Sequence, residues 1–296
     1  MLYRIEQRLR LTVNRLPEDK RVQILRCLTE GMAVRATARV TNTSKGAVLR
    51  LIAEIGPACE DFHHRFVHDV PCKRLELDEL WQFVYAKQKC LPAALSESPD
   101  HGTVWTWLGI TESRLILSYV VGGRDLDTCK LFVGDAAYRV RGKVQISSDA
   151  WGTYPAAIVQ YFREPMVDYG TIDKDFVGSD PKHPDTRYSP GRIRRCVKKV
   201  VIGDPDPDYM TTSHCERLNL TVRMQNKRYA RLTNAHSKDI RFHRWALAIQ
   251  VYFYNWCRPN AGVQKMTPAQ ASGLTKYRFT IADMLRLKMW GEAAAA

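Results

Sequence analysis

The chain has 296 residues, and its 45 Lys and Arg against 31 Asp and Glu give a formal net charge of +14. Such an excess favours a polyanionic partner, because each phosphate that Lys or Arg neutralises releases counterions. We therefore expect nucleic acid ahead of an anionic membrane surface or a neutral metabolite. No run approaches 18 consecutive apolar residues and the N-terminus lacks a signal-like apolar region, which predicts no membrane span and a cytoplasmic, nucleoid-associated protein.

The eight cysteines are scattered along the chain and form no Cys-x-x-Cys pair. Zinc sites of the finger and ribbon types need such pairs, and disulfides are rare in the cytosol. We therefore expect reduced cysteines, with neither structural zinc nor a disulfide framework.

Three helical segments and a polar turn before the third predict a helix-turn-helix region over residues 1–58. The third segment carries apolar residues at offsets 0, 3, 4 and 7 from Val48. In a helix-turn-helix it would enter the major groove, leaving Lys45 and Arg50 on its polar face to contact DNA. A small helical bundle used for dimerisation is the alternative. The three segments cover residues 18–30, 32–40 and 44–55.

After a connector at residues 59–73, the pattern changes to strands and then alternates between strands and helices. The order is strand, strand, strand, helix, strand, helix, strand, helix, which fits a mixed α+β fold of the ribonuclease H-like type, with a mixed five-stranded sheet and flanking helices. This domain is expected over 74–260, with an irregular insertion at about 170–210 and a C-terminal tail at 261–296. Strands are predicted at 74–85, 103–111, 115–121, 144–148 and 164–170, and helices at 127–138 and 154–162.

Three carboxylates, Asp78, Asp149 and Glu216, stand at or near the ends of these elements. Each has an ordinary explanation. Alternation in the first strand places Asp78 opposite the leucines, as in a solvent-facing acidic residue. Asp149 fits a turn or helix cap, and Glu216 fits a Ser-x-x-Glu capping box that begins at Ser213.

Together, however, the three suit a divalent metal, because metal-assisted phosphoryl transfer needs hard oxygen ligands that converge from separate elements. Asn219 and Arg223 follow Glu216 at offsets 3 and 7, on nearly the same helix face, where Arg223 would hold a phosphate beside the metals. His214 lies close enough in sequence to touch a phosphate or assist proton transfer.

Two basic stretches are expected to contact the DNA backbone, although each could equally be a solvated face. Aromatic residues such as Tyr229 follow the second stretch and suit either base stacking or the core. The first stretch contains Arg192, Arg194, Arg195, Lys198 and Lys199, and the second contains Arg217, Lys227, Arg228 and Arg231.

Three blocks of this sequence resemble the DDE transposases of the insertion sequence 1 type. They are Glu-Leu-Asp-Glu-Leu-Trp at 76–81, Ser-Asp-Ala-Trp-Gly at 148–152, and His-Cys-Glu-Arg-Leu-Asn-Leu at 214–220 with Arg223 beyond it. Residues 254–258 and 266–269 are similar to the C-terminal region of that family. The resemblance covers roughly residues 18–274.

The resemblance implies Asp78, Asp149 and Glu216 as ligands of two Mg²⁺ ions, which Mn²⁺ can replace, and Arg223 as their basic companion. It also implies a helix-turn-helix that binds the ends of a mobile element, terminal inverted repeats and target DNA as substrates, and a homodimer or higher oligomer on DNA. The chain departs from the family in two ways. It has no cysteine before Cys27 to form an N-terminal zinc segment, and it has Ala150 where glycine is common.

The implied activity is cleavage at the ends of an insertion sequence followed by strand transfer, both by in-line displacement at phosphorus. Two alternatives remain. One is a transposase-derived DNA-binding regulator without catalytic activity, and the other is a ribonuclease H-like nuclease without strand transfer.

Overall fold

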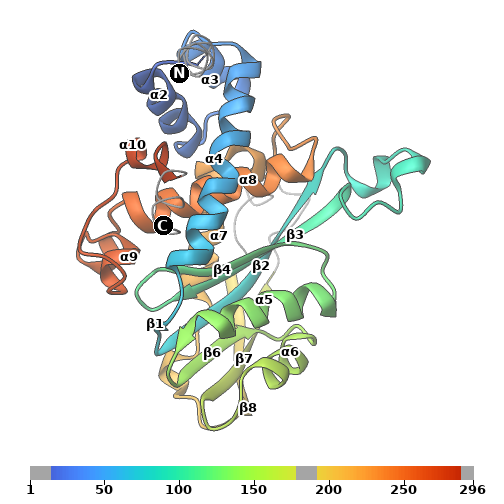
Figure 1. Ribbon diagram of the computed structural model, residues 1–296. Coiled ribbons are helices and arrows are strands. Elements are labelled where there is room, and N and C mark those ends of the chain that lie inside the picture. The colour runs from blue at the N-terminus through green and yellow to red at the C-terminus, as the bar shows by residue number, and fades with distance from the viewer. Residues whose placement is uncertain (1–14, 178–191, 288–296) are drawn as a thin grey trace, which may run out of the picture.

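The computed structural model describes residues 15–177 and 192–287 as a mixed α+β structure (Figure 1). Its centre is a six-stranded mixed sheet with the order β4-β3-β2-β6-β7-β8. Strands β2, β3 and β4 pair antiparallel, β2, β6 and β7 pair parallel, and β8 returns antiparallel to β7. The strands are β2 (Arg74–Val84), β3 (Gly102–Thr111), β4 (Ile116–Gly122), β6 (Val144–Asp149), β7 (Val167–Val177) and β8 (Arg192–Ile202).

Helices cover both faces of this sheet (Figure 1). Helices α5 (Leu126–Arg139) and α6 (Tyr154–Tyr161) lie on one face. Helices α7 (Ser213–Gln225) and α8 (Ile240–Tyr252) lie on the other, where their apolar residues pack against β2, β3 and β4. Each predicted strand and helix of this region is present, and its ends lie within a few residues of those expected, except that the strand predicted to end at residue 170 continues to Val177.

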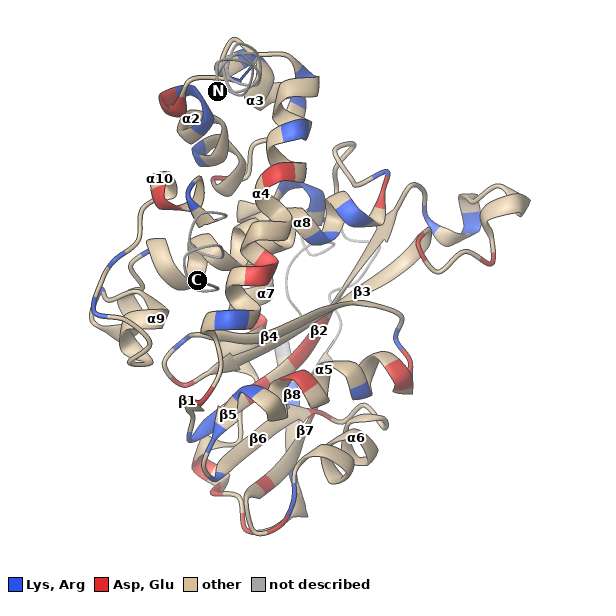
Figure 2. Cartoon of the chain, viewed as in Figure 1, with Lys and Arg blue, Asp and Glu red and all other residues tan. Residues whose placement is uncertain are grey.

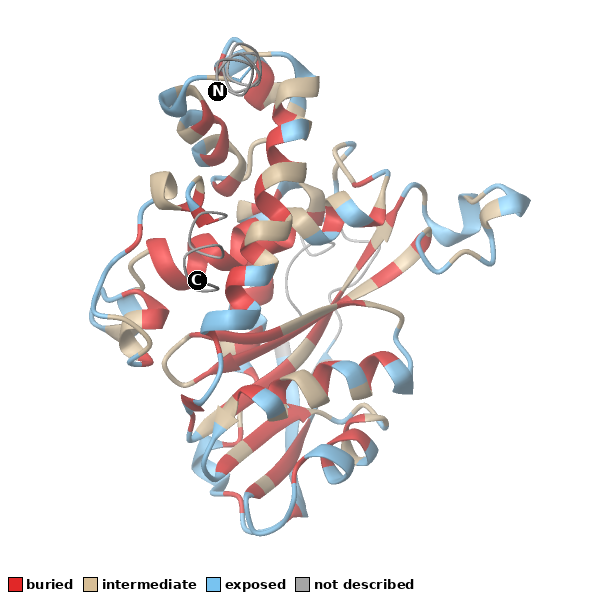
Figure 3. Ribbon diagram, viewed as in Figure 1, coloured by how far each residue is buried: buried red, intermediate tan, exposed pale blue. Residues whose placement is uncertain are grey.

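The sixth strand corrects the prediction of five strands and of an irregular insertion at 170–210. Strand β7 continues to Val177, and β8 pairs with it over most of its length. Residues 178–191 of that segment lie outside the described residues. Strand alternation provides no signal here because β8 is an edge strand that solvent reaches on both faces, so that its side chains from Ile193 to Val201 are all exposed, apolar and charged alike (Figure 3).

From residue 15 onward, three helices precede the sheet: α2 (Glu18–Thr29), α3 (Val34–Val40) and α4 (Lys45–Phe66). Helix α4 begins after Ser44, whose side chain accepts a hydrogen bond from the Ala47 N–H. It continues through the segment predicted as a connector, because the apolar stripe that starts at Val48 extends to the buried residues Cys59 and Phe62. At Gly56 it crosses α8 so closely that a Cβ would lie 2.2 Å from the Cβ of Trp245.

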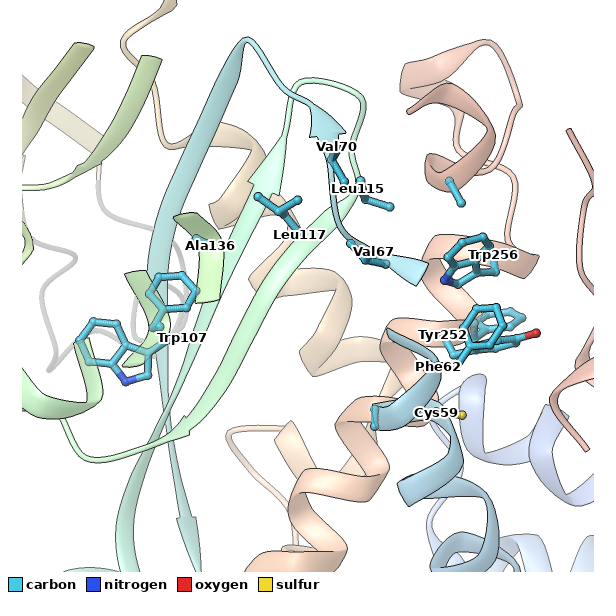
Figure 4. Packing of buried hydrophobic residues seen from close by; sticks show 14 of the residues in the cluster. Cys59, Phe62, Val67, Val70, Trp107, Leu115, Leu117, Ala136, Tyr252 and Trp256 are labelled. Atoms are coloured by element: carbon cyan, nitrogen blue, oxygen red, sulfur yellow. The ribbon is translucent and has the colours of Figure 1, made fainter. Parts of the chain in front are cut away.

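The core therefore joins the N-terminal helices to the sheet. Phe62 packs edge-to-face against Tyr252 and Trp256, while Trp107 fills the α5 side of the sheet (Figure 4). Short elements complete the chain, and the part of the predicted tail up to Leu287 packs on the same core. These elements are β1 (Val70–Pro71), β5 (Val140–Arg141), α9 (Pro268–Ala271) and α10 (Ile281–Met284). Among the described residues, no helix has the length and apolar character needed to cross a membrane.

Candidate metal centre

Asp78 and Asp149 come together where the parallel pairing of β2 with β6 ends, in the middle of β2 and at the last residue of β6. Strand β2 pairs with β6 through Leu77 and Ser148, so the next residue of each strand is an aspartate. Glu79 joins them, and ligand oxygens of Asp78, Glu79 and Asp149 all lie within 4.8 Å of one another. We call these three residues the acidic cluster. Figure 2 shows acidic residues within β2, in the middle of the sheet.

The alternation of β2 sends neighbouring carboxylates to opposite faces of the sheet. Leu75 and Leu77 face the α5 side, as predicted, and Glu79 follows them. Glu76 and Asp78 face α7, where they meet helix residues and not bulk solvent. The two faces converge at Asp149 because β6 ends there.

Glu79 is held on the α5 side by two donors. The Tyr154 hydroxyl donates to its Oε2 over 2.9 Å, and the Arg124 Nε donates to its Oε1 over 2.8 Å. The Arg124 guanidinium lies between the rings of Trp105 and Trp151. An Arg124 nitrogen is also 3.9 Å from Asp149, so this one cation serves two members of the acidic cluster.

Glu216 lies near the acidic cluster but outside it. Its carboxylate is half-exposed and accepts hydrogen bonds from Lys174, over 2.5 Å, and from the Thr212 hydroxyl, over 3.0 Å. The predicted capping box is wrong, because Thr212 is the N-cap residue and the Ser213 hydroxyl accepts from Thr211. Glu216 is still close enough for its charge to raise the pKa of Asp78.

Burial and crowding of negative charge dominate the electrostatics of this site. Burial, followed by the charges of Glu79 and Asp149, raises the pKa of Asp78 to about 7. Burial also raises the pKa of Glu79 and of Asp149, although Arg124 opposes the shift at both. Closely spaced carboxylates that resist ionisation are stabilised by a shared cation.

Two residues of α7 face the acidic cluster as the helix offsets predicted. The Asn219 amide donates to Asp78 Oδ2 over 2.7 Å, while its own Oδ1 is buried without a partner among the described residues. Arg223 is close enough to Asp78 for the two charges to interact. Its Nε is likewise buried and finds no partner in the described part of the chain. Both side chains thus keep unused hydrogen-bonding capacity beside the carboxylates.

His214 has a different place from the one predicted. Its backbone N–H and that of Cys215 donate to Glu76 Oε2 over 2.8 and 3.1 Å, and its ring Nδ1 contacts Glu76 Oε1. Glu76 therefore caps the N-terminus of α7 from a strand 138 residues earlier in the chain. His214 supports that contact, and in the described part of the chain it forms no hydrogen bond or ion pair with the acidic cluster.

The acidic cluster fits a hard divalent cation. Its ligands are carboxylate oxygens from two strands, which Mg²⁺ and Mn²⁺ prefer, and no cysteine or histidine belongs to it. The unpartnered Asn219 oxygen adds a neutral acceptor at its edge. Glu79 was not predicted, because strand alternation alone places it on the face opposite to Asp78. The feature that identifies Glu79 is the end of β6 at Asp149, because a side chain at the end of this strand lies close to residues on both faces of the sheet.

The other basic residues predicted to bind DNA are mostly on the surface (Figure 2). Lys45 and Arg50 are exposed on α4. Arg228 is turned inward and donates to the Ser237 hydroxyl, which weakens its case as a phosphate ligand, and Tyr229 is buried in the core. The side chain of Arg192 lies outside the described residues. Exposed members of the two stretches are Arg194, Arg195, Lys198, Lys199, Arg217, Lys227 and Arg231.

Comparison with known proteins does not supply a family. No protein-family model matches this sequence, and a search of curated proteins finds no match.

Proposed function

We propose that the protein is a DNA transposase of the DDE type, which cleaves DNA at the ends of an insertion sequence and joins the freed ends to target DNA. The observation that carries the proposal is the convergence of Asp78, in the middle of β2, and Asp149, at the end of β6, with Asn219 and Arg223 of α7 beside them. The three sequence blocks that resemble insertion sequence 1 transposases supply the residues of this convergence. The net charge of +14 supports a nucleic-acid substrate.

In this proposal the mixed sheet is a ribonuclease H-like fold and helices α2, α3 and α4 form a helix-turn-helix. The exposure of Lys45 and Arg50 on α4 supports a DNA-facing third helix. The parallel pairing of β2 with β6 and of β6 with β7 supports this fold, because it brings Asp78 and Asp149 close together, as the proposed chemistry requires.

Each catalytic step is a displacement at phosphorus. In the first, water attacks the phosphodiester at the element end, a P–O bond forms, and the bond to the 3′ oxygen breaks. In the second, the freed 3′ hydroxyl attacks a target phosphodiester, and the target strand releases its own 3′ oxygen. Bound Mg²⁺ would supply charge neutralisation for the attacking and departing oxygens.

The residues of this chain have separate tasks in both steps. Asp78 and Asp149 would hold the metal, and Asn219 orients Asp78 through the 2.7 Å hydrogen bond. Arg223 offers its unpartnered Nε to a phosphate oxygen, which holds the reacting phosphorus in line. No step needs a covalent bond to the protein.

Two residues, Glu216 and Glu79, are candidates for the third carboxylate of the metal site. The resemblance assigns Glu216, whereas Glu79 is the residue that completes the acidic cluster without metal. Glu216 is half-exposed and tied to Lys174, so it would join the metal after breaking that ion pair. In both assignments, Asp78 and Asp149 would hold the metal.

The test is cleavage of supercoiled and linear DNA that carries the inverted repeats flanking the gene, with Mg²⁺ present. The wild-type chain should nick the repeat ends and join them to target DNA, and Asp149→Ala should abolish cleavage while sparing DNA binding. Undiminished cleavage by that variant rules the proposal out. Nicked ends that are never joined would indicate a nuclease without strand transfer, and specific binding without cleavage at any metal concentration would indicate a regulator.

A further inference from the structure

A cavity lined by arginines lies on the flank of helix α7 that is opposite to the acidic cluster. It is a cavity of about 360 Å³ at the lower end of the size range of ligand pockets. Its lining contains Arg114, Arg217 and Arg258 and no acidic residue. We call this cavity the arginine pocket. It contains no member of the acidic cluster.

The three arginines have no electrostatic partner that uses up their donors. None of them forms a side-chain hydrogen bond or an ion pair with any residue in the described ranges. The charge of Arg114 lowers the pKa of Glu76, but the Glu76 oxygens are already occupied by His214 and Cys215. Three guanidinium groups around one cavity repel one another unless an anion lies between them.

The backbone holds Arg114 in place at some cost. Arg114 stands in the tight turn between β3 and β4 with φ at 66°, a left-handed conformation that a residue with a Cβ adopts at a cost of about 1 kcal/mol. Its N–H donates to the Thr111 carbonyl over 2.9 Å. Its guanidinium lies against Gly262, where an added Cβ would be 3.1 Å from Arg114 Nε. The turn and the glycine together fix this cation at the cavity wall.

Helix geometry relates the pocket to the acidic cluster. With 3.6 residues per turn, Glu216, Asn219 and Arg223 share one flank of α7, and Arg217 and Thr221 share roughly the opposite one. A helix with its side chains is about 10–12 Å across, and a DNA strand advances about 3.4 Å per nucleotide. The two sites are therefore about three nucleotides apart along a strand that crosses α7.

We propose that the arginine pocket binds a backbone phosphate of the DNA strand that reacts at the acidic cluster, about three nucleotides from the reacting phosphodiester. The inference rests on the proposed function and adds to it a phosphate-binding site that fixes the register of the strand. Arg114 and Arg258 form the fixed wall, and the exposed Arg217 on α7 closes over the phosphate.

The experiment measures equilibrium binding of the full chain to a mixed-sequence duplex in EDTA, by fluorescence anisotropy over a range of KCl concentrations. Arg114→Gln and Arg258→Gln should each weaken binding about three- to tenfold and lower the slope of log K against log salt by about 0.9, the value for one lost phosphate. The control is Arg163→Gln, which removes the same charge from an exposed loop at the far end of β6 and should leave the slope unchanged.

A further variant keeps every arginine and guards against misfolding. Ala261→Glu places a carboxylate at the exposed rim of the pocket and should reproduce the weaker binding and lower slope. Unchanged slopes in both arginine variants overturn the inference, and they leave the Mg²⁺ cleavage test of the proposed function intact. Conversely, a chain that never cleaves DNA but shows the predicted slopes retains the phosphate site and loses the transposase assignment.

A last arm separates a strand phosphate from a free one. Inorganic phosphate is titrated against the thermal unfolding of the wild-type chain and Arg114→Gln. If phosphate raises the melting temperature of the wild type alone while both chains bind DNA with the same slope, the pocket holds small phosphates and the strand assignment is wrong.

Discussion

Glu76 and Asp78 lie two residues apart on the same face of the same strand, yet the protein treats them differently. Glu76 accepts two backbone N–H groups from the start of α7 and a contact from the His214 ring. Asp78 accepts hydrogen bonds from the Asn219 amide and the Glu79 N–H. The carboxylates of the acidic cluster lie beside it.

Burial raises the pKa of both side chains to about 7, but their other influences have opposite signs. At Glu76 the next influences are the Cys215 N–H and Arg114, which stabilise the ionised form. At Asp78 they are the charges of Glu79 and Asp149, which destabilise it. Protein groups therefore stabilise the ionised form of Glu76, whereas the ionised form of Asp78 would be stabilised by a ligand from solution. The first carboxylate positions α7, and the second is presented for chemistry.

The largest expected effect on activity comes from Asp78→Asn, which keeps the shape of the side chain and removes its charge. We expect cleavage to fall about a thousandfold or more, because the residue would hold the metal directly. Rates of Mg²⁺-dependent strand cleavage measure the loss, and DNA binding in EDTA serves as the control for folding. Residual activity within tenfold of wild type would place the metal elsewhere.

Glu76→Ala should have its main effect on stability. It leaves the buried N–H groups of His214 and Cys215 without acceptors, which costs roughly 2–4 kcal/mol. Urea denaturation in EDTA measures the change, with Glu76→Gln as the variant that keeps one acceptor and should lose less. If Asp78→Ala were equally destabilising in EDTA, the division into structural and functional carboxylates would be wrong.

This division explains how far sequence reasoning reached. Asp78 and Asp149 were predictable because each belongs to a recognisable strand pattern, and the parallel pairing of the two strands then brings Asp78 beside the end of β6 at Asp149. The partnership of Glu76 with His214 was not, since it joins positions 138 residues apart and appears in no local pattern. The capping box at Ser213 was a local explanation that a distant carboxylate displaced.

The sheet and the arginine pocket also contain features that no local sequence pattern predicts. The four interior strands and the opposite edge strand β4 carry buried apolar residues, whereas the apolar and charged residues of β8 from Ile193 to Val201 are all exposed, so burial left no pattern to find. Arg114, Arg217 and Arg258 come from a hairpin turn, a helix and a C-terminal loop. Only the folded chain brings them together.

A comparison of Glu79→Gln with Glu216→Gln decides which residue completes the metal site. The true ligand should lose about 10- to 100-fold in Mg²⁺ affinity, and the other variant should change it only slightly. Calorimetric titration with Mg²⁺, or with Mn²⁺ followed by electron paramagnetic resonance, measures the affinity. A large effect at Glu79 with none at Glu216 would assign the third carboxylate to β2, against the family resemblance.

The smallest effect is a dependence of stability on pH in the metal-free protein. The raised pKa of Asp78 means that the folded chain binds more protons than the unfolded chain between about pH 4 and 7. Stability in EDTA should therefore fall as the pH rises through this range, by about 1–3 kcal/mol for this one group. Asp78→Asn should remove that part of the slope, and Glu76, Glu79 and Asp149, whose pKa values burial also raises, should contribute to what remains. Saturating Mg²⁺ should reverse the trend in the wild type, because the ion binds the ionised carboxylates and stabilises the folded chain as they lose their protons. A pH profile that neither Mg²⁺ nor Asp78→Asn alters would mean that the charge on Asp78 is already balanced by the protein, as it is for Glu76.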